Sequence, residues 1–148
     1  MGYSLRPITV DDKNFIYDVK KSSNYEYINR IWGWDEDYQR RDFDSDFNDN
    51  FNDFCIICVN GSDVGFLQTN TTINSVNITE IHIIPTFQGK RIGKNILQDI
   101  ISKALSEDKT ITIGCFKENE GGKRLYLQLG FSIIKTTATH YEFQYIEK

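Results

Sequence analysis

Apolar residues recur along the chain with two different periods, which predict a mixed set of strands and helices. From residue 91 to Leu105, isoleucine, leucine and alanine fall every three or four positions, so a long amphipathic helix is predicted over Arg91–Leu105. Shorter apolar runs bounded by turn residues predict strands. These lie at Tyr3–Thr9, Phe54–Asn60, Val64–Thr72, Val76–Ile84, Thr110–Phe116, Phe131–Lys135 and His140–Ile146.

The remaining segments are helical or polar. Apolar residues at loosely helical spacing predict a helix that runs from Phe15 to about Trp32. A second short helix is expected over Asp35–Phe43, and the Asn- and Asp-rich stretch Asp44–Asp53 is expected to be a polar connection. Asn119–Leu129 is a further short helix, which Gly130 ends. This order predicts a single α/β domain over residues 1–148, with a mixed central sheet flanked by helices.

Composition narrows the possible functions. The chain has 148 residues, of which 39% are hydrophobic and 26% charged, as in ordinary globular proteins. A net charge of −4 argues against a nucleic-acid partner. No apolar run is long enough to cross a bilayer, and the first residues, MGYSLRPITVDD, lack the apolar core of a signal peptide. We therefore expect a cytoplasmic protein with no membrane partner.

Cysteine spacing raises one alternative. Cys55 and Cys58 form a Cys-x-x-Cys pair, which occurs in redox and zinc sites. The pair lies inside a predicted strand, where residues three apart point to opposite faces, and no second ligand pair accompanies it. We interpret both, like Cys115, as small core residues.

The segment Ile81–Leu105 carries the most specific chemistry. An apolar strand stops at Pro85, and a basic turn bracketed by Gly89 and Gly93 leads directly into the long helix. Such a turn leaves backbone N–H groups at a helix N-terminus, where the helix dipole favours anions such as a diphosphate. The glycine spacing matches neither a dinucleotide fingerprint nor a nucleotide-binding P-loop.

Two motifs resemble those of the GNAT superfamily of N-acetyltransferases. Gln88–Gly93 is similar to its acyl-CoA signature, Gln/Arg-x-x-Gly-x-Gly/Ala. Asn119, followed by Leu125-Tyr126 and Leu129-Gly130-Phe131, is similar to its Asn…Leu-Tyr-x-x-x-Gly-Phe pattern. The chain departs from the family at Arg91, which replaces a glycine, and at Gly122, where alanine is common. Arg91 is compatible with the turn if its backbone is helical.

The resemblance implies a fold and an activity. The fold is the GNAT acyl-CoA N-acyltransferase fold, a mostly antiparallel sheet splayed between its fourth and fifth strands. The activity is transfer of an acetyl group from acetyl-CoA, without a metal, to a primary amine of a small molecule or peptide. The amine attacks directly in a ternary complex. The alternative is a catalytically silent CoA-binding regulatory module. A homodimer is possible, and the acceptor stays open.

The resemblance also places cofactor residues. Backbone amides of residues 89–94 would hold the pyrophosphate, and the backbone of the last strand residues before the turn would pair with the pantetheine arm and polarise the thioester carbonyl. Asn119 could hold the pantetheine amide, cap its helix, or do both. The expected cofactor-binding residues are Ile83, Ile84, Gln88, Gly89, Lys90, Arg91, Ile92, Gly93, Lys94, Asn119 and Tyr126.

Proton transfer needs an acid and a base. Tyr126 is the candidate acid, because a phenol can protonate the CoA thiolate as it leaves, although a helical tyrosine can also be a core residue. Glu80 is the candidate base, acting through water. Strand alternation puts His82 on the same face, so His82 is its rival, and a water chain without a dedicated base is the third option.

The acceptor pocket is expected to be lined by the first two helices and the last strand pair. Acidic groups beside two tryptophans suit a cation, by charge pairing and cation–π contact. The tryptophans could equally anchor the helices to the sheet. The candidate substrate-binding residues are Trp32, Trp34, Glu36, His82 and Tyr141, with Asp35, Tyr38 and His140 beside them.

Overall fold

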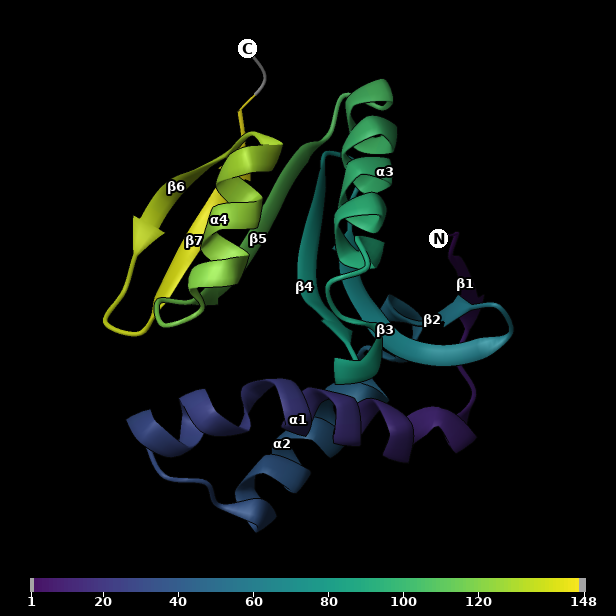
Figure 1. Ribbon diagram of the computed structural model, residues 1–148, viewed down its shortest axis with the longest axis vertical. Helices are drawn as coiled ribbons and strands as arrows, with labels where there is room; N and C mark the ends of the chain where they lie inside the picture. The colour runs from purple at the N-terminus through teal and green to yellow at the C-terminus, as the bar shows by residue number, and fades with distance from the viewer. Residues whose placement is uncertain (1, 147–148) are drawn as a thin grey trace. The chain divides into compact units, whose positions relative to one another are not determined.

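The computed structural model describes residues 2–146 and confirms the mixed α/β class (Figure 1). The observed order of helices and strands is the predicted one. In chain order the elements are β1 (Ser4–Pro7), the 3₁₀ helix η1 (Val10–Asp12), α1 (Lys13–Ile31), α2 (Glu36–Asp49), η2 (Phe51–Asp53), β2 (Phe54–Val59), β3 (Ser62–Thr71), β4 (Ser75–Ile83), η3 (Pro85–Phe87), α3 (Ile92–Ser106), β5 (Thr110–Phe116), α4 (Glu120–Leu129), β6 (Phe131–Thr136) and β7 (His140–Tyr145).

Seven strands form one sheet in the order β1-β2-β3-β4-β5-β7-β6. The pairs β1–β2, β2–β3, β5–β7 and β6–β7 are antiparallel, whereas β4 and β5 run parallel. The parallel pairing joins Ser75–Ile78 to Thr110–Ile113, and it ends before either strand ends. The sheet is therefore mostly antiparallel, as the family resemblance implied.

The described chain divides into two compact units. The first comprises the residues up to Gln68 together with Glu80–Ile92, and the second comprises Thr69–Thr79 together with the residues from Gly93 onward. β3 and β4 each contribute one part to each unit.

Aromatic residues of α2 form much of the core of the first unit. Phe43 and Phe47 lie one turn apart on this helix, both are 2% exposed, and their ring centroids are 5.7 Å apart. Tyr17 of α1 contacts Phe43 edge-on, and α1 and α2 lie side by side (Figure 1). The predicted polar connection over Asp44–Asp53 was therefore wrong. The helix continues to Asp49 because its inward face repeats phenylalanine every four residues.

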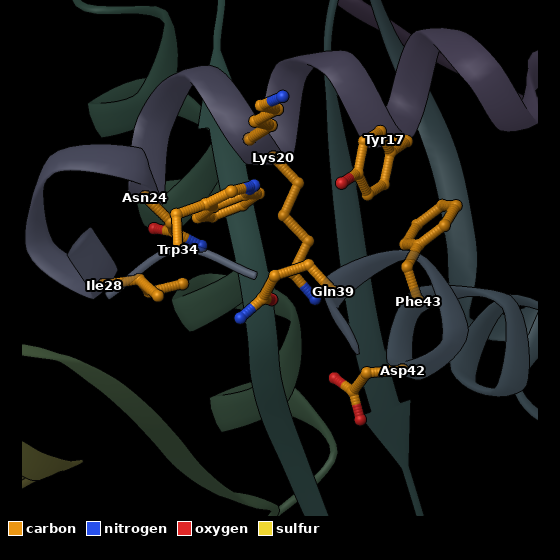
Figure 2. A pocket seen from close by; sticks show the side chains of 9 residues that line it. Tyr17, Lys20, Asn24, Ile28, Trp34, Gln39, Asp42 and Phe43 are labelled. Carbon is orange, nitrogen blue, oxygen red and sulfur yellow. The ribbon is translucent and has the colours of Figure 1, made fainter. Parts of the chain in front are cut away.

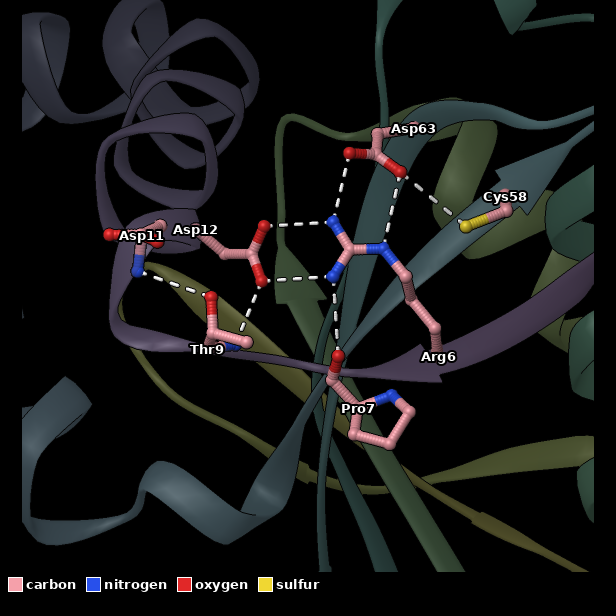
Figure 3. A network of polar contacts seen from close by, with 7 residues as sticks. All are labelled: Arg6, Pro7, Thr9, Asp11, Asp12, Cys58 and Asp63. Atoms are coloured by element: carbon pink, nitrogen blue, oxygen red, sulfur yellow. Dashed lines mark hydrogen bonds and ion pairs between the residues drawn. The ribbon is translucent and has the colours of Figure 1, made fainter.

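An arginine ties the start of the chain to the β2–β3 hairpin (Figure 3). Arg6 donates to both carboxylate oxygens of Asp12, at 3.0 and 2.8 Å, and to Asp63 at 2.9 Å. The hydrogen bond from Arg6 is the main reason why the pKa of Asp12 is lowered. Asp12 also accepts a hydrogen bond from the Thr9 N–H, which completes a capping box at η1.

In the second unit α4 packs over β7 (Figure 1). Tyr126 of α4 contacts the rings of Phe143 and Phe131. Gly130 ends the helix with a left-handed φ of 109°, as predicted from its position. The inward face of α3 is buried, and within this unit it consists of Ile96, Leu97, Ile101 and Ala104.

Two further features of the described chain concern membrane crossing and cysteine reactivity. Within residues 2–146, no helix combines the length and the apolar character that a membrane crossing requires. All three cysteines are free thiols, and burial raises the pKa of Cys55 and of Cys115 to about 11. Both stay protonated near neutral pH, which makes them poor nucleophiles.

Candidate active site

The turn between β4 and α3 has an unusual backbone. Gly89 has a φ of 75° and Arg91 a φ of 67°, and α3 begins only at Ile92. The expectation that Arg91 has a helical backbone was therefore wrong. A left-handed conformation costs a non-glycine residue about 1–2 kcal/mol, which accounts for the glycine that the family motif places here.

The same turn is open and positively charged. A Cβ added to Gly89 or to Gly93 would meet no protein atom within 4 Å. Lys90, Arg91 and Lys94 enter none of the ion pairs formed within residues 2–146. Three cations without acidic partners, on a protein of net charge −4, stand beside the first turn of a long helix. These residues fit a diphosphate anion.

The end of β4 offers one main-chain amide rather than two. The N–H of Ile84 donates to the Val64 carbonyl at 2.8 Å, so this amide is used inside the sheet. Neighbouring residues of a strand direct their backbone groups to opposite edges, so those of Ile83 face away from β3. The Ile83 carbonyl accepts a hydrogen bond from Nε2 of Gln88 at 2.9 Å. Of the two amides predicted to contact the pantetheine arm, those of Ile83 and Ile84, only the N–H of Ile83 therefore stays a candidate.

Glu80 and His82 lie in direct contact on one face of β4. Nε2 of His82 hydrogen-bonds Oε2 of Glu80, and Nζ of Lys20 on α1 lies 3.7 Å from Oε1. Burial alone would raise the pKa of Glu80, but the hydrogen bond with His82 and the charges of His82 and Lys20 outweigh it. The pKa of Glu80 is consequently lowered. Strand alternation predicted that Glu80 and His82 share a face, but it did not predict the contact between Lys20 and Glu80.

Asn119 caps α4. Its Oδ1 accepts a hydrogen bond from the N–H of Gly122 at 2.9 Å. The predicted capping role is thus confirmed, and a second role toward a cofactor stays a prediction. Tyr126, one of the helix's inward-facing residues, is 7% exposed.

Trp34 and Glu36 form a network between α1 and α2. Glu36 accepts hydrogen bonds from the Tyr17 hydroxyl at 2.6 Å, from Nζ of Lys21 at 2.6 Å and from Nε1 of Trp34 at 3.1 Å. The bond from Lys21 is the largest cause that lowers the pKa of Glu36 to about 2. These internal donors balance the Glu36 charge.

A small pocket lies beside this network (Figure 2). Its volume is about 20 Å³, which is room for a water molecule rather than for a substrate. Trp32 lies outside it and is 62% exposed. The lining residues are Tyr17, Lys20, Lys21, Asn24, Ile28, Trp34, Gln39, Asp42 and Phe43.

In the second unit two lysines lie near the ring of Tyr141. The ammonium groups of Lys123 and Lys117 lie 4.9 and 5.8 Å from its ring centroid. The His140 ring contacts the Phe116 ring in a tilted arrangement, with centroids 4.2 Å apart, and its Nδ1 lies 2.7 Å from Oγ1 of Thr139.

Sequence reasoning missed Lys20, Tyr17 and Lys21, which hold the two acidic candidates. The sequence did contain a signal for Lys20, because Ile16, Val19 and Lys20 share the inward face of α1. A lysine at an inward position of an amphipathic helix indicates a buried acidic partner.

The fold and the turn are those that the motif resemblance implied. A family model described as the acetyltransferase (GNAT) family matches residues 15–131. Because this match covers most of the chain, the chain belongs to the acetyltransferase (GNAT) family and is an N-acetyltransferase.

Solved structures share this fold. PaiA N-acetyltransferase from Thermoplasma acidophilum, in complex with coenzyme A, is 16% identical with a TM-score of 0.73, over 97% of this chain and 98% of that one. A GNAT family acetyltransferase from Elizabethkingia anophelis, with acetyl-CoA bound, is 16% identical with a TM-score of 0.66, over 96% of each chain. Ribosomal-protein-S18-alanine N-acetyltransferase from Escherichia coli is 15% identical with a TM-score of 0.68, over 97% of this chain and 92% of that one. No curated protein sequence matches the chain.

Proposed function

We propose that this enzyme transfers an acetyl group from acetyl-CoA to a primary amine of a small molecule or peptide. The turn before α3 is the observation that carries the proposal. This turn and the first residues of α3 combine two open glycines, Gly89 and Gly93, with three cationic side chains that have no acidic partners in the described chain. Coenzyme A presents a diphosphate that such a turn can bind through its main-chain amides.

Each step of the reaction then has a candidate group. The neutral amine attacks the thioester carbon, a C–N bond forms, and the C–S bond breaks. The N–H of Ile83 polarises the carbonyl, and Tyr126 gives its proton to the departing sulfur. The Glu80–His82 pair or ordered water takes the proton from the amine. Family membership and the Asn119–Tyr126 motif support this assignment.

An acceptor screen tests the proposal. Purified protein is incubated with saturating acetyl-CoA and a panel of amines that includes polyamines, aminoglycosides, lysine peptides and peptides with a free N-terminus. Free thiol and acetylated product are measured together. We expect release of CoA that depends on at least one amine. Tight CoA binding without transfer to any amine would instead support the alternative, a catalytically silent CoA-binding module.

A further inference from the structure

One carboxylate oxygen of Glu80 is hydrogen-bonded, and the other faces a cation. Nε2 of His82 contacts Oε2, and Nζ of Lys20 lies 3.7 Å from Oε1. The side chains of Lys20 and Glu80 are 25% and 22% exposed, so the contact is partly shielded from water. A carboxylate that accepts a hydrogen bond from an imidazole N–H and faces an ammonium group is a weak proton acceptor. In the part of the chain that is described, Nδ1 of His82 has no hydrogen-bond partner.

We propose that His82 accepts the amine proton, that Glu80 orients His82, and that Lys20 is a positioning residue that holds Glu80. This inference rests on the proposed acetyl transfer and deepens it. A carboxylate that bonds one ring nitrogen fixes the imidazole orientation and stabilises the imidazolium when it forms. Lys20 completes the unit from α1, because it holds the second oxygen of the same carboxylate.

The surroundings of His82 support one orientation of its ring. The Phe66 ring of β3 lies 5.4 Å from the imidazole. The charged groups that face the pair are Lys20 from α1 and Glu80 itself. Asp46 of α2 instead accepts from the Gln68 amide, at 3.1 and 3.2 Å, further along β3. The ring is therefore confined by an apolar neighbour and oriented by one carboxylate.

The proton balance is simple. As the amine nitrogen bonds to the acetyl carbon, its proton passes to Nδ1 of His82, and the imidazolium pairs with the ionised Glu80. The electrons of the C–S bond leave with sulfur, which takes a proton from Tyr126. His82 then returns its proton to solvent, and the tyrosine is reprotonated.

The pH dependence of kcat/KM for acetyl transfer separates the three roles. We expect His82→Gln to lower kcat/KM by about 10²-fold. Glu80→Gln should cost less and move the acid-side midpoint to lower pH, because the imidazolium loses its counter-ion. Lys20→Met should move that midpoint to higher pH, by up to about 1 unit, because a neighbouring positive charge is removed. Lys20→Arg should restore the wild-type midpoint.

Two controls complete the design. Lys13→Met removes one charge from the same helix, where Lys13 pairs with Asp44 at 2.9 Å, and it should leave the midpoint unchanged. Imidazole added to His82→Ala should restore part of the transfer, which excludes a folding defect. Full activity of His82→Gln alongside an inactive Glu80→Gln would overturn the inference alone. So would a Lys20→Met variant with an unmoved midpoint. A wild-type protein that acetylates no amine rejects the proposed function, and the inference with it.

Discussion

Asn119 and Gly122 depend on each other at the start of α4. Oδ1 of Asn119 accepts the Gly122 N–H at 2.9 Å, and a Cβ on Gly122 would lie 2.7 Å from Nδ2 of the same side chain. Glycine at this position is therefore part of the cap. Alanine, which is common here in the family, would displace the Asn119 amide from its present position.

A double-mutant cycle tests this dependence. Gly122→Ala alone should give no gain in stability, because the loss of a cap, about 1 kcal/mol, offsets the gain in helix propensity, also about 1 kcal/mol. In an Asn119→Ala background the same substitution should stabilise the protein by up to about 1 kcal/mol. Urea unfolding of the four proteins measures both steps. Equal effects of Gly122→Ala in the two backgrounds would mean that the residues are independent.

Substitutions of Arg91 should affect stability and CoA binding differently. Because its φ is 67°, Arg91→Gly should be more stable than Arg91→Ala by about 1 kcal/mol. Both variants should bind CoA more weakly than wild type, because both lose the same charge. Unfolding free energies and calorimetric titrations with CoA measure the two properties. Equal stabilities of the two variants would contradict the left-handed backbone.

Tyr126→Phe should lower kcat for acetyl transfer by about 10²-fold and leave CoA affinity near that of wild type. The Tyr126 ring packs at 5.3 Å on Phe143 and at 6.1 Å on Phe131, and a phenylalanine ring keeps both contacts. Leu125→Met, a volume-conserving change at the preceding position, is the control. An unchanged kcat would remove Tyr126 as the acid.

Glu36 should contribute stability that depends on pH. Its folded-state pKa of about 2 lies below the ordinary value of 4.5. Ionised Glu36 therefore adds its full contribution to the free energy of unfolding at pH values above 4.5. This contribution disappears as the pH falls through about 2. The stability difference between wild type and Glu36→Gln should shrink over this range in urea unfolding. Glu26→Gln, at a carboxylate that is 83% exposed, should show no such trend. A Glu36→Gln difference that stays constant with pH would exclude the network as its source.

Most of the fold follows from local patterns that tertiary contacts reinforce. The β4–α3 segment, with its proline stop and apolar stripe, and the β2–β3 hairpin, with Asn60 and Gly61 in left-handed conformations, lie within one or two residues of their predicted bounds. α2 was underestimated, because its Asp and Asn content indicates a loop while the Phe43 and Phe47 pair indicates a helix. The helix forms because it buries the Phe43 and Phe47 rings.

The candidate site was only partly predictable, for a physical reason. The residues of the glycine turn are close to one another in sequence, and so are Glu80 and His82. Spacing alone therefore predicts each of these two groups. Lys20 and Glu80 are sixty residues apart, and their contact depends on how α1 packs on the sheet. The positive φ of Arg91 was also missed, although the glycine that the family motif has at this position was a signal for it.

A calorimetric titration of CoA into wild type and Gly93→Val tests the central claim most directly. A side chain at residue 93 would enter space that holds no protein atom within 4 Å of the new Cβ, so the variant should fold normally. If main-chain amides of this turn bind the diphosphate, wild type binds CoA and the valine variant binds it at least about tenfold more weakly. Equal affinity of the two proteins for CoA would contradict the account.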